Sequence, residues 1–131
     1  MIAGSRFVID SSAWIEYLEG FPPGKKAAEI IEKEGTIIIT PRIVMAEVYS
    51  KTLRWGGDAE KAKTIIESFS APFDEDNETY FIAGRIHAEL KKKSKNTSLA
   101  DAIVLAIARR NNAKLVTKDF HQKGPNTIFI G

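Results

Sequence analysis

The sequence predicts an α/β fold, a three-layer α/β/α sandwich with a central parallel sheet, in a single domain over residues 1–131. Three observations predict it. Short apolar, often β-branched runs such as FVI and TIII alternate with longer segments that carry apolar residues at helical spacing. Strands separated by helices form parallel sheets that are covered on both faces. The length suits one compact domain, and no repeat, low-complexity tract or linker interrupts it.

The first half of the chain predicts two strands and four helices, separated by turn and capping residues. Gly20 and a Pro-Pro pair end the first helix, because glycine adopts the conformation of a helix end and proline cannot continue a helix. We expect Thr40 to cap the third helix and Pro41 to take its first position, where a missing N–H costs nothing. The expected strands are 7–9 and 36–39, and the expected helices are 11–19, 25–34, 41–55 and 59–69.

The second half predicts two longer helices and two strands. Helix 77–93 has apolar residues at helical spacing, and the strongly apolar helix 99–110 begins after Ser98, a good N-cap. The other expected elements are strands at 114–117 and 127–130, an extended piece at 71–73, and a turn or short helix at 119–123. In such a sheet, ligands bind at the carboxyl ends of the strands.

Composition excludes several classes of protein. The chain has no cysteine, which excludes disulfides, thiolate zinc sites and cysteine nucleophiles and fits a reducing compartment. No apolar run approaches the roughly 18 residues of a membrane span, and the first residues lack the apolar segment of a secretory signal. We therefore expect a cytoplasmic protein without membrane contact. The formal net charge of +2 is too small to indicate nucleic-acid binding by itself.

Four acids lie where this architecture places a ligand site. Asp10 and Asp119 follow predicted strands. Glu47 lies about two turns into the helix after the second strand, and Asp101 lies in the first turn of helix 99–110. Each acid also has a simpler explanation. Asp10 and Asp119 could cap helices, Asp101 could form a capping box with Ser98, and Glu47 could be a surface residue.

Carboxylates that meet at one edge repel one another, and a hard divalent cation offsets their charge. Mg²⁺ prefers oxygen ligands and keeps several waters, and Mn²⁺ uses similar ligands. Such a site can activate water and stabilise the leaving oxygen of a phosphodiester without a histidine base. The hydroxyls of Ser12 and Thr117 stand two residues from an acid, where they can orient it or bind a metal's water. We do not expect His87 or His121 to be catalytic.

The segments around these acids resemble a known family. FVIDSSAWIEYL contains Asp10, TPRIVMAEVYS contains Glu47, TSLADAIVLAIA contains Asp101 and LVTKDF ends just after Asp119. In this order, over essentially the whole chain, they resemble PIN-domain ribonucleases of the type found as toxins of VapBC toxin–antitoxin pairs. The resemblance implies a magnesium- or manganese-dependent endoribonuclease in which the four acids bind the metal. It also implies supporting hydroxyls at Ser12, Ser98 and Thr117.

The resemblance further implies protein partners. Toxins of this family usually form homodimers, and a small VapB-type antitoxin lays its C-terminal tail across the toxin. Apolar side chains that could receive such a tail, unless they belong to the core, are Trp14, Tyr17, Leu18, Phe21, Tyr49, Leu53 and Trp55.

A basic cluster precedes Asp101 in the sequence. By itself it is typical of the solvated end of helix 77–93, where cations suit the helix dipole. Beside an acidic metal site, the same cluster could bind RNA phosphates. The candidates for RNA contact, two of them outside the cluster, are Arg42, Lys91, Lys92, Lys93, Lys95 and Lys118.

Other classes of protein also place an aspartate after a parallel strand. A haloacid-dehalogenase-like phosphatase needs a second aspartate two residues later, and that position is Ser12. A receiver domain needs an earlier pair of acids, which the chain lacks. The remaining alternatives are a non-catalytic PIN-like domain that binds RNA or protein, and a stand-alone RNA-processing nuclease.

Overall fold

The computed structural model of the chain describes residues 4–93, 96–119, 124 and 126–131. Within them, four strands form one parallel sheet in the order β2-β1-β3-β4. The strands are β1 (Arg6–Ile9), β2 (Ile37–Ile39), β3 (Lys114–Thr117) and β4 (Thr127–Phe129). The helices are α1 (Ser11–Glu19), α2 (Gly24–Ile31), α3 (Arg42–Arg54), α4 (Ala59–Phe69), α5 (Asn77–Lys93) and α6 (Leu99–Arg110).

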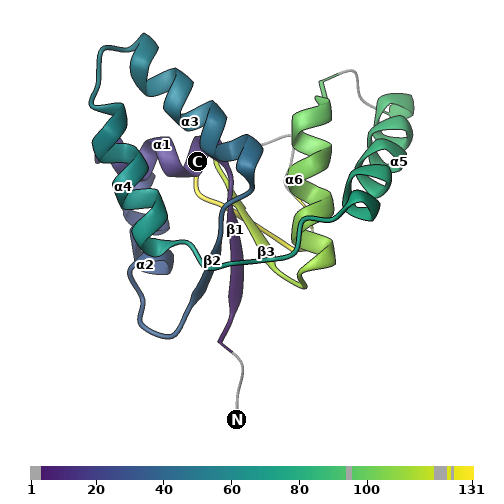
Figure 1. Cartoon of the computed structure of the whole chain (residues 1–131), viewed down its shortest axis with the longest axis horizontal. Coiled ribbons are helices and arrows are strands. Elements are labelled where there is room, and N and C mark those ends of the chain that lie inside the picture. The colour runs from purple at the N-terminus through teal and green to yellow at the C-terminus, as the bar shows by residue number, and fades with distance from the viewer. Residues whose placement is uncertain (1–3, 94–95, 120–123, 125) are drawn as a thin grey trace.

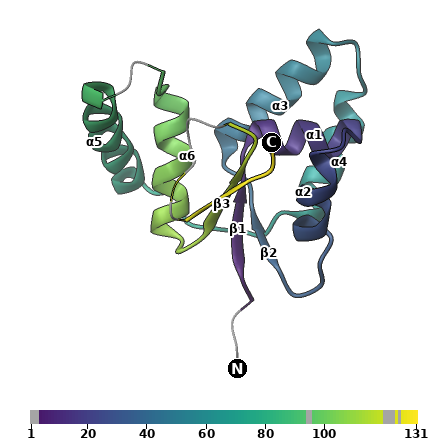
Figure 2. The same ribbon diagram turned by 180° about the vertical axis from the view of Figure 1, so that it is seen from behind.

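The sheet is the middle layer of three (Figure 1). Helices α1 to α4 lie on one side of it and α5 and α6 on the other, and Figure 2 shows the same division from behind. Helix α6 packs against β1 and β3, whereas α5 packs mainly on α6. The predicted α/β/α sandwich with a central parallel sheet is therefore confirmed.

Strand β1 lies at the centre of the sheet between β2 and β3. Val8 and Ile9 are fully buried, as is Val116 of β3. A parallel sheet covered on both faces needs such continuous apolar strands, which explains the short runs in the sequence. Because all strands run in one direction, the chain leaves β1, β2 and β3 at the same edge, at Asp10, Thr40 and Lys118.

Most predicted elements are confirmed, with α1, α5, α6 and β3 matching the expected bounds. The expected cap of α3 is wrong: the N-cap residue is Pro41, without a side-chain bond, and the Thr40 hydroxyl instead lies 2.7 Å from that of Ser70. Helix α2 ends early, at Ile31. Segment 71–73, expected as an extended piece, has no regular secondary structure, and an isolated bridge pairs the preceding Ser70 with Ile38. The turn expected at 119–123 lies largely outside the described residues.

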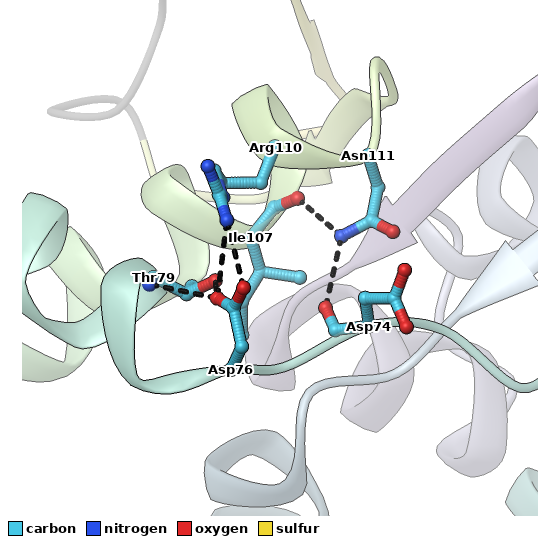
Figure 3. A network of polar contacts seen from close by, with 6 residues as sticks. All are labelled: Asp74, Asp76, Thr79, Ile107, Arg110 and Asn111. Atoms are coloured by element: carbon cyan, nitrogen blue, oxygen red, sulfur yellow. Dashed lines mark hydrogen bonds and ion pairs between the residues drawn. The ribbon is translucent and has the colours of Figure 1, made fainter.

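A polar network ties the segment between α4 and α5 to the end of α6 (Figure 3). The Thr79 N–H and hydroxyl donate to Asp76 Oδ1 at 3.0 and 2.7 Å, so Asp76 caps α5. The Arg110 guanidinium donates to both oxygens of Asp76, at 3.2 and 2.9 Å. The Asn111 amide reaches the Asp74 carbonyl at 3.5 Å. None of the described helices is long and apolar enough to cross a membrane.

Candidate metal centre

Asp10 stands at the junction of β1 and α1, where it caps the helix. Its Oδ1 accepts from the Ala13 N–H at 3.0 Å and from the Ser12 hydroxyl at 2.7 Å. Its backbone N–H donates to the carbonyl of Val116 at 3.1 Å, which holds the junction against β3. Only 5% of Asp10 is exposed. The predicted cap is confirmed, and it holds the carboxylate at the carboxyl edge of the sheet.

Burial raises the pKa of the Asp10 carboxyl above its ordinary value. Hydrogen bonds from Thr117, Ser12 and Ala13 lower that pKa, and the charge of Asp101 raises it again. A carboxylate in this environment is stabilised by any positive charge that reaches it.

Glu47 lies on α3 and is half-buried. Burial raises the pKa of its carboxyl, and the charges of Asp101 and Asp10 raise it further. A hydrogen bond from Ser11 and the charge of Lys51 act in the opposite direction. Glu47 is therefore not an isolated surface acid, because it shares an electrostatic environment with two other acids and is oriented by the first residue of α1.

Asp101 completes this group from the first turn of α6. Its backbone N–H donates to Ser98 Oγ at 3.0 Å, and its Oδ2 accepts from the Ser98 N–H at 3.2 Å. The capping box expected from the sequence is thus present. The cap uses one carboxylate oxygen, and the charge of Asp101 still acts on both Asp10 and Glu47. The capping and clustering explanations are therefore compatible.

The hydroxyls predicted to support the site connect α1 to the end of β3. Ser12 Oγ lies 3.4 Å from Thr117 Oγ1 and accepts from the Lys118 N–H at 2.9 Å. Thr117, which is fully buried, accepts from the Asp119 N–H at 2.9 Å. These contacts place the backbone of Asp119 next to the residues that hold Asp10. The role of the Asp119 carboxylate as a fourth ligand stays a prediction.

These residues fit a hydrated hard cation better than a fully ligated one. In the part of the chain that the structure describes, no group of three or more His, Cys, Asp or Glu side chains could hold a metal ion as it stands. Mg²⁺ keeps several waters and often takes only one or two carboxylates from the protein. The negative charges of Asp10, Glu47 and Asp101 repel one another, and such an ion would offset this repulsion. These three could hold such an ion through its bound waters.

Three of the cations proposed to contact RNA are engaged with acids. Lys118 forms an ion pair with Glu16, Arg42 pairs with Glu75 at 2.6 Å, and Lys92 pairs with Glu89 at 3.3 Å. Lys91 and Lys93 are exposed at the end of α5, and Lys95 lies outside the described residues.

The sequence interpretation missed Glu16, an acid that is only 6% exposed. Its position among apolar residues of α1, in AWIEYL, was the available signal, because a buried carboxylate requires a partner. That partner is Lys118, which directly follows β3, so the ion pair fastens the end of β3 to α1. The pair lies one residue from Thr117, which contacts the Asp10 carboxylate.

Comparisons with known proteins agree with this architecture. The PIN domain family model matches residues 7–124. VapBC2 from Rickettsia felis, in a crystal structure with a promoter DNA fragment, contains a chain similar in fold, with a TM-score of 0.71, 21% identity and coverage of 95% of this chain and 96% of that chain. A chain of a toxin–antitoxin complex from Klebsiella pneumoniae is similar in fold with a TM-score of 0.67 and 18% identity, and the match covers 95% of this chain and 97% of that chain. A chain of VapBC-1 from nontypeable Haemophilus influenzae has a TM-score of 0.65 and 16% identity, and the match covers 89% of each chain. No curated protein matches the chain.

The fold and the acidic edge thus define an α/β protein of the nuclease-like PIN class. The match over residues 7–124 shows that the chain belongs to the PIN domain family.

Proposed function

We propose that the chain is a metal-dependent endoribonuclease that hydrolyses RNA phosphodiester bonds. The observation that carries this proposal is that the charge of Asp101 acts on both Asp10 and Glu47, acids from three different elements, at the carboxyl edge of a PIN-domain sheet. PIN domains are generally nucleases. A bound Mg²⁺ or Mn²⁺ ion would supply an activated water and stabilise the leaving oxygen.

In this proposal the residues of the chain bind and orient. Asp10, Glu47 and Asp101 hold the ion, and Asp119 is proposed as a fourth ligand. Ser12 and Thr117 orient Asp10, with which both share hydrogen bonds, and Ser98 fixes Asp101 through the capping box. Lys91, Lys92 and Lys93, which are exposed at the end of α5, remain candidates for contact with RNA phosphates, and so does Lys95, which lies outside the described residues.

The test is RNA cleavage by the purified protein in Mg²⁺. Asp10→Asn and Glu47→Gln should each lower the cleavage rate by about 100-fold or more, since even a supporting group at a metal site contributes about 10–100-fold. Glu29→Gln, which neutralises an exposed acid of α2, is the matched control and should cleave like wild type. Equal cleavage by wild type and all three variants would assign the activity to a contaminant.

We further propose that the protein is the toxin of a type II toxin–antitoxin pair, a cytoplasmic single-domain protein that forms a homodimer and binds a VapB-type antitoxin. The fold similarity to chains of VapBC structures supports this proposal. So does an apolar groove of about 610 Å³ between α3 and α4, lined by Met45, Leu53 and Ile66. Leu53 and Trp55 are 57% and 59% exposed, whereas Trp14, also considered for docking, is fully buried and belongs to the core.

A non-catalytic PIN-like domain that binds RNA or protein is the second candidate. It is favoured by the lack, among the described residues, of an acidic group that could hold a metal ion as it stands. Titration with Mn²⁺ by calorimetry separates the two: the nuclease binds the ion with loss of affinity in Asp10→Asn, and the non-catalytic domain does not bind it. Co-purification with an antitoxin distinguishes a toxin from a stand-alone RNA-processing nuclease.

A further inference from the structure

Several cations of the described residues are neutralised by acids. Ion pairs join Lys118 to Glu16, Arg42 to Glu75 at 2.6 Å, and Arg110 to Asp76 at 2.9 Å. An acid next to a cation cancels most of its attraction for a phosphate. The positive charge that holds a nucleic acid should therefore come from cations without such a partner.

A groove of about 710 Å³ runs beside α6, and of the acids assigned to the candidate metal centre Asp101 is the one among its described lining residues. Asp101 lines one end and Arg109 the other, and eight helical positions between them correspond to about 12 Å. The starts of β1, β3 and β4 form the opposite wall, through residues such as Phe7, Leu115 and Thr127. In Figures 1 and 2 the start of β4 accordingly lies near the last turn of α6.

Three exposed cations, Arg6, Arg109 and Lys114, line the end of the groove that is remote from the metal centre. None of them forms an ion pair with another residue that the structure describes. The single acid among the described lining residues is Asp101. The groove thus carries unpaired positive charge at one end and Asp101, one acid of the candidate centre, at the other.

The remaining lining suits the bases of a nucleic acid. Partly exposed apolar side chains, among them Phe7, Leu90 and Leu105, form part of the groove, and the amides of Asn112 and Asn126 add donors and acceptors. Sites for single strands combine cations that follow the backbone with apolar or aromatic surface for the bases. A duplex would offer its phosphates but not its base faces to such a groove.

We propose that this groove binds the single-stranded RNA segment next to the phosphate that is cleaved, with Arg6, Arg109 and Lys114 on its backbone. The proposal rests on the proposed function and adds to it a binding site and a direction: the strand runs from the acidic edge along α6 toward the start of β1.

The test measures binding of a fluorescein-labelled, mixed-sequence single-stranded RNA oligonucleotide by anisotropy. All proteins carry Asp10→Asn, so that the RNA stays intact. The groove variant combines Arg6→Gln, Arg109→Gln and Lys114→Gln. The control combines Lys25→Gln, Lys26→Gln and Lys61→Gln, the same loss of charge on exposed residues of α2 and α4 across the sheet. Circular dichroism checks that both variants fold.

The groove variant should bind RNA at least about tenfold more weakly, and the slope of log affinity against log salt should fall by about 2, since each phosphate contact to a single strand contributes about 0.7. The control should match its parent. If both variants lose equal affinity, the attraction is a property of net charge and the groove has no role. A polyglutamate peptide that binds more tightly than RNA and loses affinity in the groove variant would assign the groove to an acidic protein segment instead.

Cleavage of RNA by the wild-type protein in Mg²⁺, scored separately, distinguishes failure of this inference from failure of the proposed function. If wild type cleaves but the groove variant binds RNA as its parent does, the groove proposal is wrong and the nuclease stands. If wild type does not cleave RNA and the Asp10→Asn parent does not bind it, both are wrong.

Discussion

Asp10 shows how one residue serves the fold and a site at once. Its Oδ1 satisfies the Ala13 N–H at the start of α1, which a neutral asparagine could also do. An aspartate in the same place adds a charge whose burial raises its pKa. The charge is therefore a cost to the isolated fold and becomes favourable only when a cation binds.

Replacing Asp10 by asparagine should stabilise the metal-free protein by about 1 kcal/mol, or about 3–5 °C in Tm. Because the folded-state pKa is raised, the folded state keeps a proton that the unfolded state releases. Wild-type stability therefore falls as pH rises from about 4 through the folded-state pKa. Asp10→Asn should flatten that fall. Urea unfolding in EDTA across this range measures both effects, and a variant less stable than wild type near neutral pH would contradict them.

At the scale of elements, two helices depend on aspartate caps in different ways. Asp58 caps α4 by accepting from the Lys61 N–H at 3.0 Å. Asp58→Ala should lower the free energy of unfolding by about 1 kcal/mol. Asp76 caps α5 and also bonds Arg110 of α6, so Asp76→Ala should lower Tm further than Asp58→Ala. Thermal unfolding followed by circular dichroism compares the two. Arg110→Gln keeps the cap, so its Tm should lie between those of wild type and Asp76→Ala. If Arg110→Gln lowers Tm as much as Asp76→Ala does, the whole effect comes from the ion pair and not from the cap.

The elements also show what the sequence can predict. Local signals predicted the Asp10 cap, the Ser98 capping box and the bounds of α5 and α6, because each depends on residues within a few positions. The alternation of strands and helices predicted the parallel sheet, and it placed Asp10, which follows β1, at the carboxyl edge of that sheet. Contacts between distant segments carry no such signal. Thr40 bonds to Ser70 instead of capping α3, and Glu16 finds Lys118 across 102 positions.

At the scale of the whole molecule, the candidate centre joins both helical layers to the sheet. Asp10 ends the central strand, Glu47 belongs to α3 on one side, and Asp101 belongs to α6 on the other (Figure 1). Repulsion among the three carboxylates acts between layers that hydrophobic packing holds together. A cation at this edge should therefore stabilise the global fold and not merely a local loop.

This arrangement predicts that Mg²⁺ raises the thermal stability of the entire domain. A ligand at ten times its Kd stabilises the folded state by about 1.4 kcal/mol, which corresponds to a Tm increase of about 4–7 °C. Differential scanning calorimetry should show this shift in wild type, and Glu47→Gln should reduce it at the same Mg²⁺ concentration, because one of the three repelling charges is gone. Glu29→Gln removes an exposed acid of α2 and should keep the full shift. An equal shift in wild type and both variants would show that the ion acts by general screening and that no metal centre exists at this edge.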